Sequence, residues 1–292
     1  MYRILVYGLG KEYDKHVNLL KAGELLGKFC VKGVTRSNGW IYKHVDGYPF
    51  IPVEEIGWQD YDIFVIAAEM GSPSYADIRK VVLSKGISEN KIIPVAAFSI
   101  PYFDLDKYME ISDMSIFALN CWGGLTYHSL HLPFRSPLIN MFMNEYEYIK
   151  MMGNLRWYME QPVTFSYWGD GVHGGKYPVG RLGDVLLHFN HASKFEDALA
   201  DWNRRKERIN YDKIYAMMFT QKTDVAELFD KLPYNKVCFT PFKNNNIRCA
   251  HYIAGGGVLN DTVNSISKGI IKDYDALDLL LGIDNNKRIV VE

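Results

Sequence analysis

Short apolar runs that alternate with helical stretches constrain the fold of this chain more than any other feature. In the first hundred residues, four runs have the length and composition of buried strands: residues 3–7, 29–34, 61–67 and 91–95. Helical spacing fills two of the intervals between them, at residues 13–28 and 75–85. This alternation across short turns predicts an α/β fold with a doubly wound parallel sheet.

The length of 292 residues predicts two domains, each large enough to bury a core. We place the first at residues 1–104 and the second, an α/β domain with a mixed sheet, at residues 112–292. The connector between them, residues 101–111, is polar and aromatic. Because a flexible linker is richer in Gly and Ser, this connector is expected to pack.

Composition narrows the class of partner. The net charge is −1, and the first 112 residues hold 13 basic and 14 acidic residues against 20 of each in the remainder. Neither part has the basic excess of a nucleic-acid binder, so a small molecule or another protein is the expected partner. No apolar run approaches the roughly 20 residues of a membrane span. The N-terminus, M-Y-R-I-L-V-Y-G, resembles a strand rather than a signal peptide.

The four cysteines lie far apart and form no C-x-x-C pair. This spacing is typical of reduced cysteines in a cytoplasmic protein and predicts no metal site. A further expectation concerns residues 288–291, which are apolar enough to pair with an edge strand or with a second subunit of a homo-oligomer.

The turn Gly8-Leu9-Gly10 follows the first predicted strand, at the edge of the sheet where such folds bind ligands. Gly8 and Gly10 match the first two glycines of the dinucleotide fingerprint and are the candidate cofactor-binding residues. The third glycine position holds Tyr13, and no acidic residue follows the strand that ends at residue 34. A nicotinamide cofactor is therefore disfavoured, and the cofactor stays unassigned.

The segment 117–131 (F-A-L-N-C-W-G-G-L-T-Y-H-S-L-H) carries the strongest signal of chemistry. A predicted strand ends before Cys121, and apolar residues at helical spacing follow it. A helix N-terminus favours negative charge, so the thiol pKa of Cys121 is expected to be lowered, making it a candidate nucleophile. The alternative is that Cys121 is a core residue under a tight turn. Candidate ligand-binding residues of the turn are Asn120, Gly123 and Gly124.

Two histidines fall in a predicted strand at residues 184–191 (D-V-L-L-H-F-N-H). His188 and His191 are an odd number of residues apart, so a regular strand directs them to opposite faces. We expect one to face the core and the other, with His191 favoured, to reach a cleft as a general base. Candidates to orient the base are Asn120, Asn190 and Asp184.

A charged helix is predicted at residues 194–208, with Trp202, Arg205 and Arg208 on roughly one face. Guanidinium groups pair with phosphate or carboxylate, and a neighbouring Trp can stack on a ring, so this face is a candidate anion clamp. The alternative is a solvated helix surface.

The first hundred residues resemble the Rossmann-like module that precedes sugar-modifying domains in bacterial polysaccharide enzymes. The resemblance rests on the ordered motifs V-Y-G-L-G, V-K-G-V-T, G-Y-P-F-I-P-V-E-E-I, Y-D-I-F-V-I-A-A and G-I-S-E-N-K-I-I-P-V. It implies either the handling of nucleotide sugars or a scaffold role.

Residues from about 112 to 242 resemble a bacterial family often described as exopolysaccharide-biosynthesis proteins of unknown function. The motifs are N-C-W-G-G, S-P-L-I-N-M-F, Y-P-V-G, L-H-F-N-H, W-N-R-R-K-E-R-I-N and K-V-C-F-T. The resemblance implies synthesis or decoration of cell-surface polysaccharide. The order of a Cys, a strand His and an R-x-x-R helix also resembles a papain-like cysteine peptidase family.

Three functions follow from these observations. The first is a glycosyl- or acyl-type transferase acting on a nucleotide sugar or phosphorylated sugar. The second is a Cys–His hydrolase or acyltransferase with Cys121 as nucleophile. The third is a non-catalytic sugar-nucleotide-binding or assembly protein, for which we expect Cys121 in closed apolar surroundings with no histidine in reach.

Overall fold

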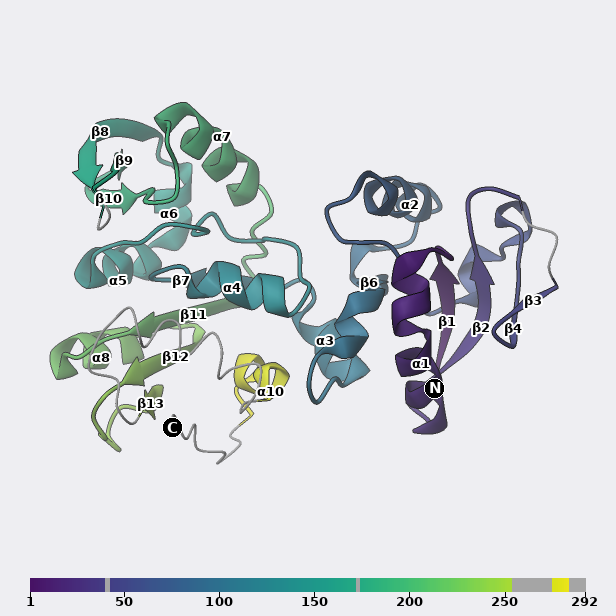
Figure 1. Cartoon of the computed structure of the whole chain (residues 1–292). Helices are drawn as coiled ribbons and strands as arrows, with labels where there is room; N and C mark the ends of the chain where they lie inside the picture. Colours follow the sequence, from purple (N-terminus) through teal and green to yellow (C-terminus); the bar gives the residue numbers. More distant parts are fainter. Residues whose placement is uncertain (40–42, 172–173, 254–274, 284–292) are drawn as a thin grey trace. The chain divides into compact units, whose positions relative to one another are not determined.

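A computed structural model describes residues 1–39, 43–171, 174–253 and 275–283 (Figure 1). The chain divides into two compact units, Met1–Ser112 and Asp113–Glu292. The segment expected to be a connector belongs to the first unit. There Asp104 accepts a hydrogen bond from the N–H of Lys107 and caps helix α3 (Leu105–Ile111). The same carboxylate pairs with Lys28 at 3.1 Å, which holds α3 onto this unit.

The first unit is built on a parallel sheet of strand order β2-β1-β5-β6. Its strands are β1 (Tyr2–Tyr7), β2 (Phe29–Thr35), β5 (Ile63–Ile66) and β6 (Ile92–Pro94). Helices α1 (Lys11–Leu25) and α2 (Pro73–Ser84) connect them, together with a short hairpin of β3 (His44–Val45) and β4 (Tyr48–Pro49). The α/β class predicted from the alternation is confirmed.

Local chemistry sets the helix ends in this unit. Ser72 accepts a hydrogen bond from the N–H of Tyr75 and, with Pro73 in the first turn, starts α2. Helix α1 ends three residues before the predicted end at residue 28, because Gly27 takes a positive φ of 71°. The remaining turns are 3₁₀ segments: η1 (Val53–Glu55), η2 (Trp58–Asp60), η3 (Glu89–Lys91) and η4 (Val95–Ser99).

The second unit has two separate sheets. One is parallel, with the order β13-β12-β11-β7, and the other is antiparallel, with the order β10-β9-β8. The parallel strands are β7 (Ser115–Ala118), β11 (Ile214–Phe219), β12 (Asn235–Thr240) and β13 (Ala250–Tyr252). The antiparallel strands are β8 (Val163–Asp170), β9 (Lys176–Leu182) and β10 (Val185–His188).

Helix α5 lies between the two sheets, and α7 lies beside the antiparallel one (Figure 1). The helices are α4 (Trp122–Ser129), α5 (Glu145–Gly153), α6 (Leu155–Glu160), α7 (Phe195–Lys206), α8 (Thr223–Asp230) and α10 (Ala276–Leu281). One core of aromatic and methionine side chains, including Tyr148, Met151 and Trp202, joins the helices to both sheets.

The sequence of this unit also predicts a strand at residues 138–143, a helix at 144–159 and a loop from residue 167, and the structure differs at each. The helix expected at 144–159 is two helices, because Asn154 leaves the helical region with φ −140°. The strand expected at 138–143 makes an isolated bridge between Phe142 and His188. The loop expected to begin at residue 167 is instead part of β8 up to Asp170. The glycine run at 255–257, which the sequence suggests as a hinge, and the segment 288–291 both lie outside the described residues.

Among the described helices, none has both the length and the apolar character needed to cross a membrane.

Candidate functional site

Cys121 lies at the junction where β7 ends and α4 begins. The side-chain oxygen of Asn120 accepts a hydrogen bond from the N–H of Trp122 at 3.0 Å and so closes the turn that leads into the helix. Gly123 allows the helix to pass close to the strand, since an added Cβ would lie 3.0 Å from the Cβ of Ala118. Tyr127, on the same helix, accepts a hydrogen bond from the N–H of Ile116 at 2.7 Å. These contacts fix α4 against β7.

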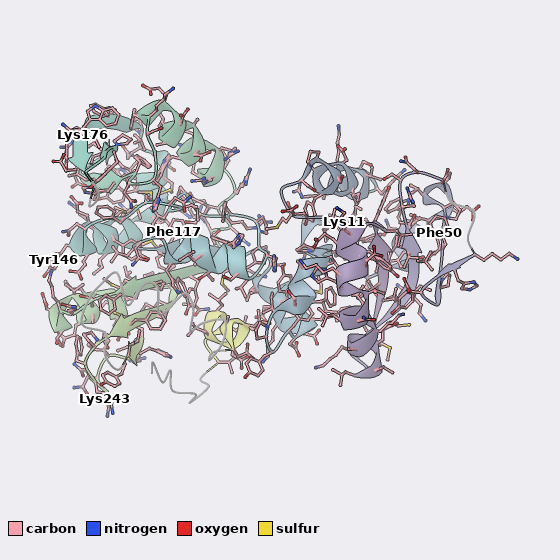
Figure 2. All side chains as sticks on the ribbon, in the orientation of Figure 1. Lys11, Phe50, Phe117, Tyr146, Lys176 and Lys243 are labelled. Atoms are coloured by element: carbon pink, nitrogen blue, oxygen red, sulfur yellow. The ribbon has the colours of Figure 1, made fainter. Side chains whose placement is uncertain are left out.

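His191 reaches this junction through a relay of backbone hydrogen bonds. The N–H of Met143 donates to the carbonyl of Leu119 at 3.1 Å, two residues before Cys121. The adjacent Phe142 exchanges backbone hydrogen bonds of 3.1 and 3.0 Å with His188, the last residue of β10. The chain turns immediately after β10, so His191 lies at the end of β7. Two labels in Figure 2 help to find these strands: Phe117 lies on β7, and Lys176 lies at the start of β9.

The structure brings Cys121 and His191 into contact, with 3.3 Å between Sγ and Nε2. The sulfur belongs to a half-buried residue and the imidazole to an exposed one. Burial raises the pKa of the Cys121 thiol, and its own backbone N–H offsets this only in part. The lowered thiol pKa expected from the helix N-terminus is therefore wrong. Because the thiol keeps its proton at neutral pH, an adjacent base is needed to remove it.

His188 has a structural setting away from this pair. Its ring stacks on Phe142 with 4.5 Å between centroids, and its Nδ1 lies 3.1 Å from the hydroxyl of Tyr177. Burial lowers the pKa of His188, which favours the neutral ring. Of the two candidate bases, only His191 contacts the cysteine in the described part of the chain.

The three residues expected to orient the base make no hydrogen bond to His191 within the described residues. Asp184 lies in the turn before β10, where it pairs with Lys150 and accepts a hydrogen bond from Tyr158 at 2.7 Å. Asn120 closes the turn that leads into α4. The Oδ1 atom of Asn190 is buried without a hydrogen-bond partner among the described groups.

A hollow of about 90 Å³ opens beside His191. Its apolar wall is formed by Pro137, Ile139, Phe189, Ala192, Ala198 and Trp202, and its polar groups are Asn140, His191, Asp201 and Arg205. Sequence reasoning missed Asn140 and Asp201. Asn140 has a positive φ of 57°, a conformation that Asn tolerates better than most residues. A Cβ on Gly124 would lie 3.5 Å from the Oδ1 of Asn140, which places the start of α4 next to the hollow.

The predicted anion clamp has only one arginine in the wall of the hollow. Arg205 lines it and pairs with Asp201 at 2.6 Å. Arg208 follows the end of α7 and is exposed. Trp202 lines the hollow but is 1% exposed and packs against Phe189, so its face is not open for stacking.

The first unit explains Gly8 and Gly10 through the backbone. Gly8 has φ +113°, and an added Cβ would lie 2.7 Å from the carbonyl oxygen of Ala67. Gly10 precedes α1, where an added Cβ would meet no atom within 4 Å. The buried Tyr13 stands at the third position of the fingerprint, as the sequence indicated. Across the residues that the structure describes, no group of three or more His, Cys, Asp or Glu side chains could hold a metal ion.

Comparison with known proteins gives a family but no activity. A family model described as "Domain of unknown function (DUF1919)" matches residues 97–278, and a second, "C2185-like, N-terminal", matches residues 1–93. An "Uncharacterized protein" of Haemophilus influenzae is 34% identical over 157 residues, which cover 52% of this chain and 73% of that protein.

Proposed function

Since the chain belongs to the family described as a domain of unknown function (DUF1919), we propose its activity from the geometry of the second unit: it is a cysteine-dependent acyltransferase. Cys121 is the nucleophile and His191 is the general base. The observation that carries the proposal is the 3.3 Å contact between Sγ of Cys121 and Nε2 of His191, a residue that also lines the hollow.

The reaction has two steps that restore the enzyme. His191 takes the thiol proton as Sγ of Cys121 attacks the carbonyl carbon of an acyl donor, and the leaving group departs with that proton. The acyl group is now a thioester on Cys121. An acceptor hydroxyl gives its proton to His191 and attacks the thioester carbonyl carbon. The S–C bond breaks, and Cys121 regains the proton from the imidazolium.

Two features of the site support this division of roles. The raised thiol pKa means that Cys121 is not a preformed thiolate, so the imidazole in reach supplies the step that burial disfavours. The setting also differs from the one expected for a non-catalytic protein, in which no histidine would be in reach of Cys121. As the acceptor we propose a sugar hydroxyl, on the basis of the resemblance to exopolysaccharide-biosynthesis proteins.

The test compares Cys121 with the other cysteines of the same chain. Cys30 is half-buried like Cys121 and makes no described hydrogen bond to a histidine, whereas Cys238 and Cys249 are buried. Iodoacetamide at pH 7 should alkylate Cys121 at least about tenfold faster than Cys30, measured by peptide mass spectrometry. A simple acyl thioester should then add one acyl mass to the wild type and none to Cys121→Ser.

The Cys30→Ser variant is the matched control and should keep both reactions. Equal alkylation of Cys30 and Cys121, together with no acyl adduct on the wild type, would remove the basis for the proposal.

A further inference from the structure

Arg205 is a largely buried charge in the wall of the hollow that His191 also lines. Its side chain is 12% exposed, and it lines the same hollow as His191 among apolar side chains that include Ile139 and Phe189. Burial lowers the pKa of Arg205, with Asp201 acting in the opposite direction. A guanidinium stays charged in proteins even so, which makes its burial costly unless it is fully paired.

The positive charge of Arg205 is only partly balanced by its carboxylate partner. Asp201 is shared, because Arg204 contacts it at 2.5 Å and Arg205 contacts it at 2.6 Å. Arg208 also acts on Arg205, since its charge lowers the pKa of that guanidinium. Asp201 is thus the carboxylate partner of both Arg204 and Arg205, and a negative charge placed in the hollow would give Arg205 a partner of its own.

The guanidinium of Arg205 also has hydrogen-bond donors that lack a good acceptor. Its Nε atom is buried and has no partner among the described groups. Its Nη1 reaches the carbonyl of Ile139 only at 3.4 Å, the long end of the hydrogen-bond range. A buried donor without a partner has lost its hydrogen bonds to water without replacing them, which is unfavourable. An acceptor on a ligand would supply the missing hydrogen bond.

We propose that the hollow is the acyl-group subsite and that Arg205 selects a short acyl chain ending in a carboxylate. This inference rests on the proposed acyltransferase function. With the acyl carbonyl carbon at Sγ of Cys121, the methylene groups contact Ile139 and Phe189, and the terminal carboxylate pairs with Arg205. The hollow has space for several water-sized groups, which suits a chain of a few carbons. The covalent step is unchanged: the thioester forms on Cys121 and the donor thiol leaves with the proton.

The experiment offers the full chain two thioesters of N-acetylcysteamine, one succinyl and one butyryl. Both acyl groups have four carbons, and only the first ends in a carboxylate. Intact-mass spectrometry follows the acyl-enzyme, and we expect succinylation of Cys121 to be at least about tenfold faster than butyrylation. Arg205→Gln should abolish this preference, whereas Asp201→Asn should increase it by removing the competing carboxylate.

Arg181→Gln is the matched control, because Arg181 is an exposed arginine on β9 outside the hollow, and it should keep the preference. The donor ratio of the wild type tests the inference even where Arg205→Gln does not fold. Equal rates for the two donors on the wild type would overturn the carboxylate subsite and leave the Cys121–His191 pair intact. No adduct from either donor, with alkylation of Cys121 no faster than that of Cys30, would overturn the proposed function itself.

Discussion

Two turns of this molecule have the same architecture and different chemistry. Each follows the carboxyl end of a parallel strand and starts a helix: Gly8-Leu9-Gly10 between β1 and α1, and Asn120-Cys121 between β7 and α4. The first turn presents two glycines, and the second presents a thiol in contact with an imidazole. The strand–turn–helix geometry therefore determines where a site can lie, whereas the side chains at the turn determine its chemistry.

The difference arises from the chain between β7 and β11. In the first unit, β1 is followed by α1 and directly by its sheet neighbour β2. In the second unit, the connection from β7 to its neighbour β11 contains the antiparallel sheet, and the turn after β10 carries His191. Phe142 and Met143 tie this sheet to the end of β7. The inserted sheet thus provides the second reacting group.

Removing the imidazole should make the second turn as unreactive as the first, and this is the largest expected effect. His191→Ala should slow alkylation and acylation of Cys121 at pH 7 by about 10²-fold or more, because general-base assistance contributes that much. Burial raises the thiol pKa, so the variant should regain reactivity only as the pH rises beyond 9. The measurement is the pH dependence of the iodoacetamide rate at Cys121.

His188→Asn is the control for that comparison, since the Asn side chain can also form a hydrogen bond with the hydroxyl of Tyr177. Its alkylation rate should stay within about threefold of the wild type. A drop equal to that of His191→Ala would show that the two histidines act together and would contradict the assignment of His191 as the base.

The sequence predicted much of this comparison, for reasons visible in particular residues. Apolar runs and glycines are local signals, so both strand–turn–helix units and Cys121 could be recognised. The strand expected at residues 184–191 ends at His188, so His191 is separated from His188 by the turn after β10 and not by alternation along one strand. The contact between Cys121 and His191 depends on Phe142, which lies in a segment predicted to be a strand. In the structure this segment forms a single bridge, between Phe142 and His188. Asp201 and Asn140 could not be assigned because only the folded chain brings α7 and a positive-φ loop to one hollow. The sequence predicted a lowered pKa for the Cys121 thiol, but burial raises it. The residues that bury the thiol are distant in the sequence, so a local pattern could not indicate this effect.

The next largest effect should come from the first turn. Gly8→Ala places a Cβ 2.7 Å from the carbonyl oxygen of Ala67 at a φ of +113°. The strain and the clash should cost roughly 2–4 kcal/mol of unfolding free energy. Hydrogen-exchange mass spectrometry should show lost protection in peptides of β1 and β5, with the alkylation rate of Cys121 unchanged. Full protection of β1 in the variant would mean that the close contact with Ala67 is absent.

A smaller effect should appear in the pH dependence of stability in the second unit. Burial lowers the pKa of His188 in the folded state, so the unfolded state binds a proton first as the pH falls below about 6.5. The stability that the neutral ring contributes is present above that pH and decreases as the pH falls toward the folded pKa. Urea unfolding followed by hydrogen exchange in β10 should show a shallower decrease for His188→Asn than for the wild type. Parallel curves for the two proteins would remove His188 as the cause.

The smallest expected effect separates a structural glycine from a ligand-binding one. Gly10→Ala adds a Cβ to open space at an ordinary negative φ, so the unfolding free energy should change by less than about 0.5 kcal/mol. If the turn also approached a phosphate through its backbone, the same substitution would obstruct that approach. The increase in melting temperature caused by a nucleoside diphosphate sugar should therefore be compared between the wild type and Gly10→Ala. A thermal shift in the wild type that the variant loses would mean that the first turn binds a ligand. The two turns would then differ in the ligand that each binds, and the first would not be only a scaffold.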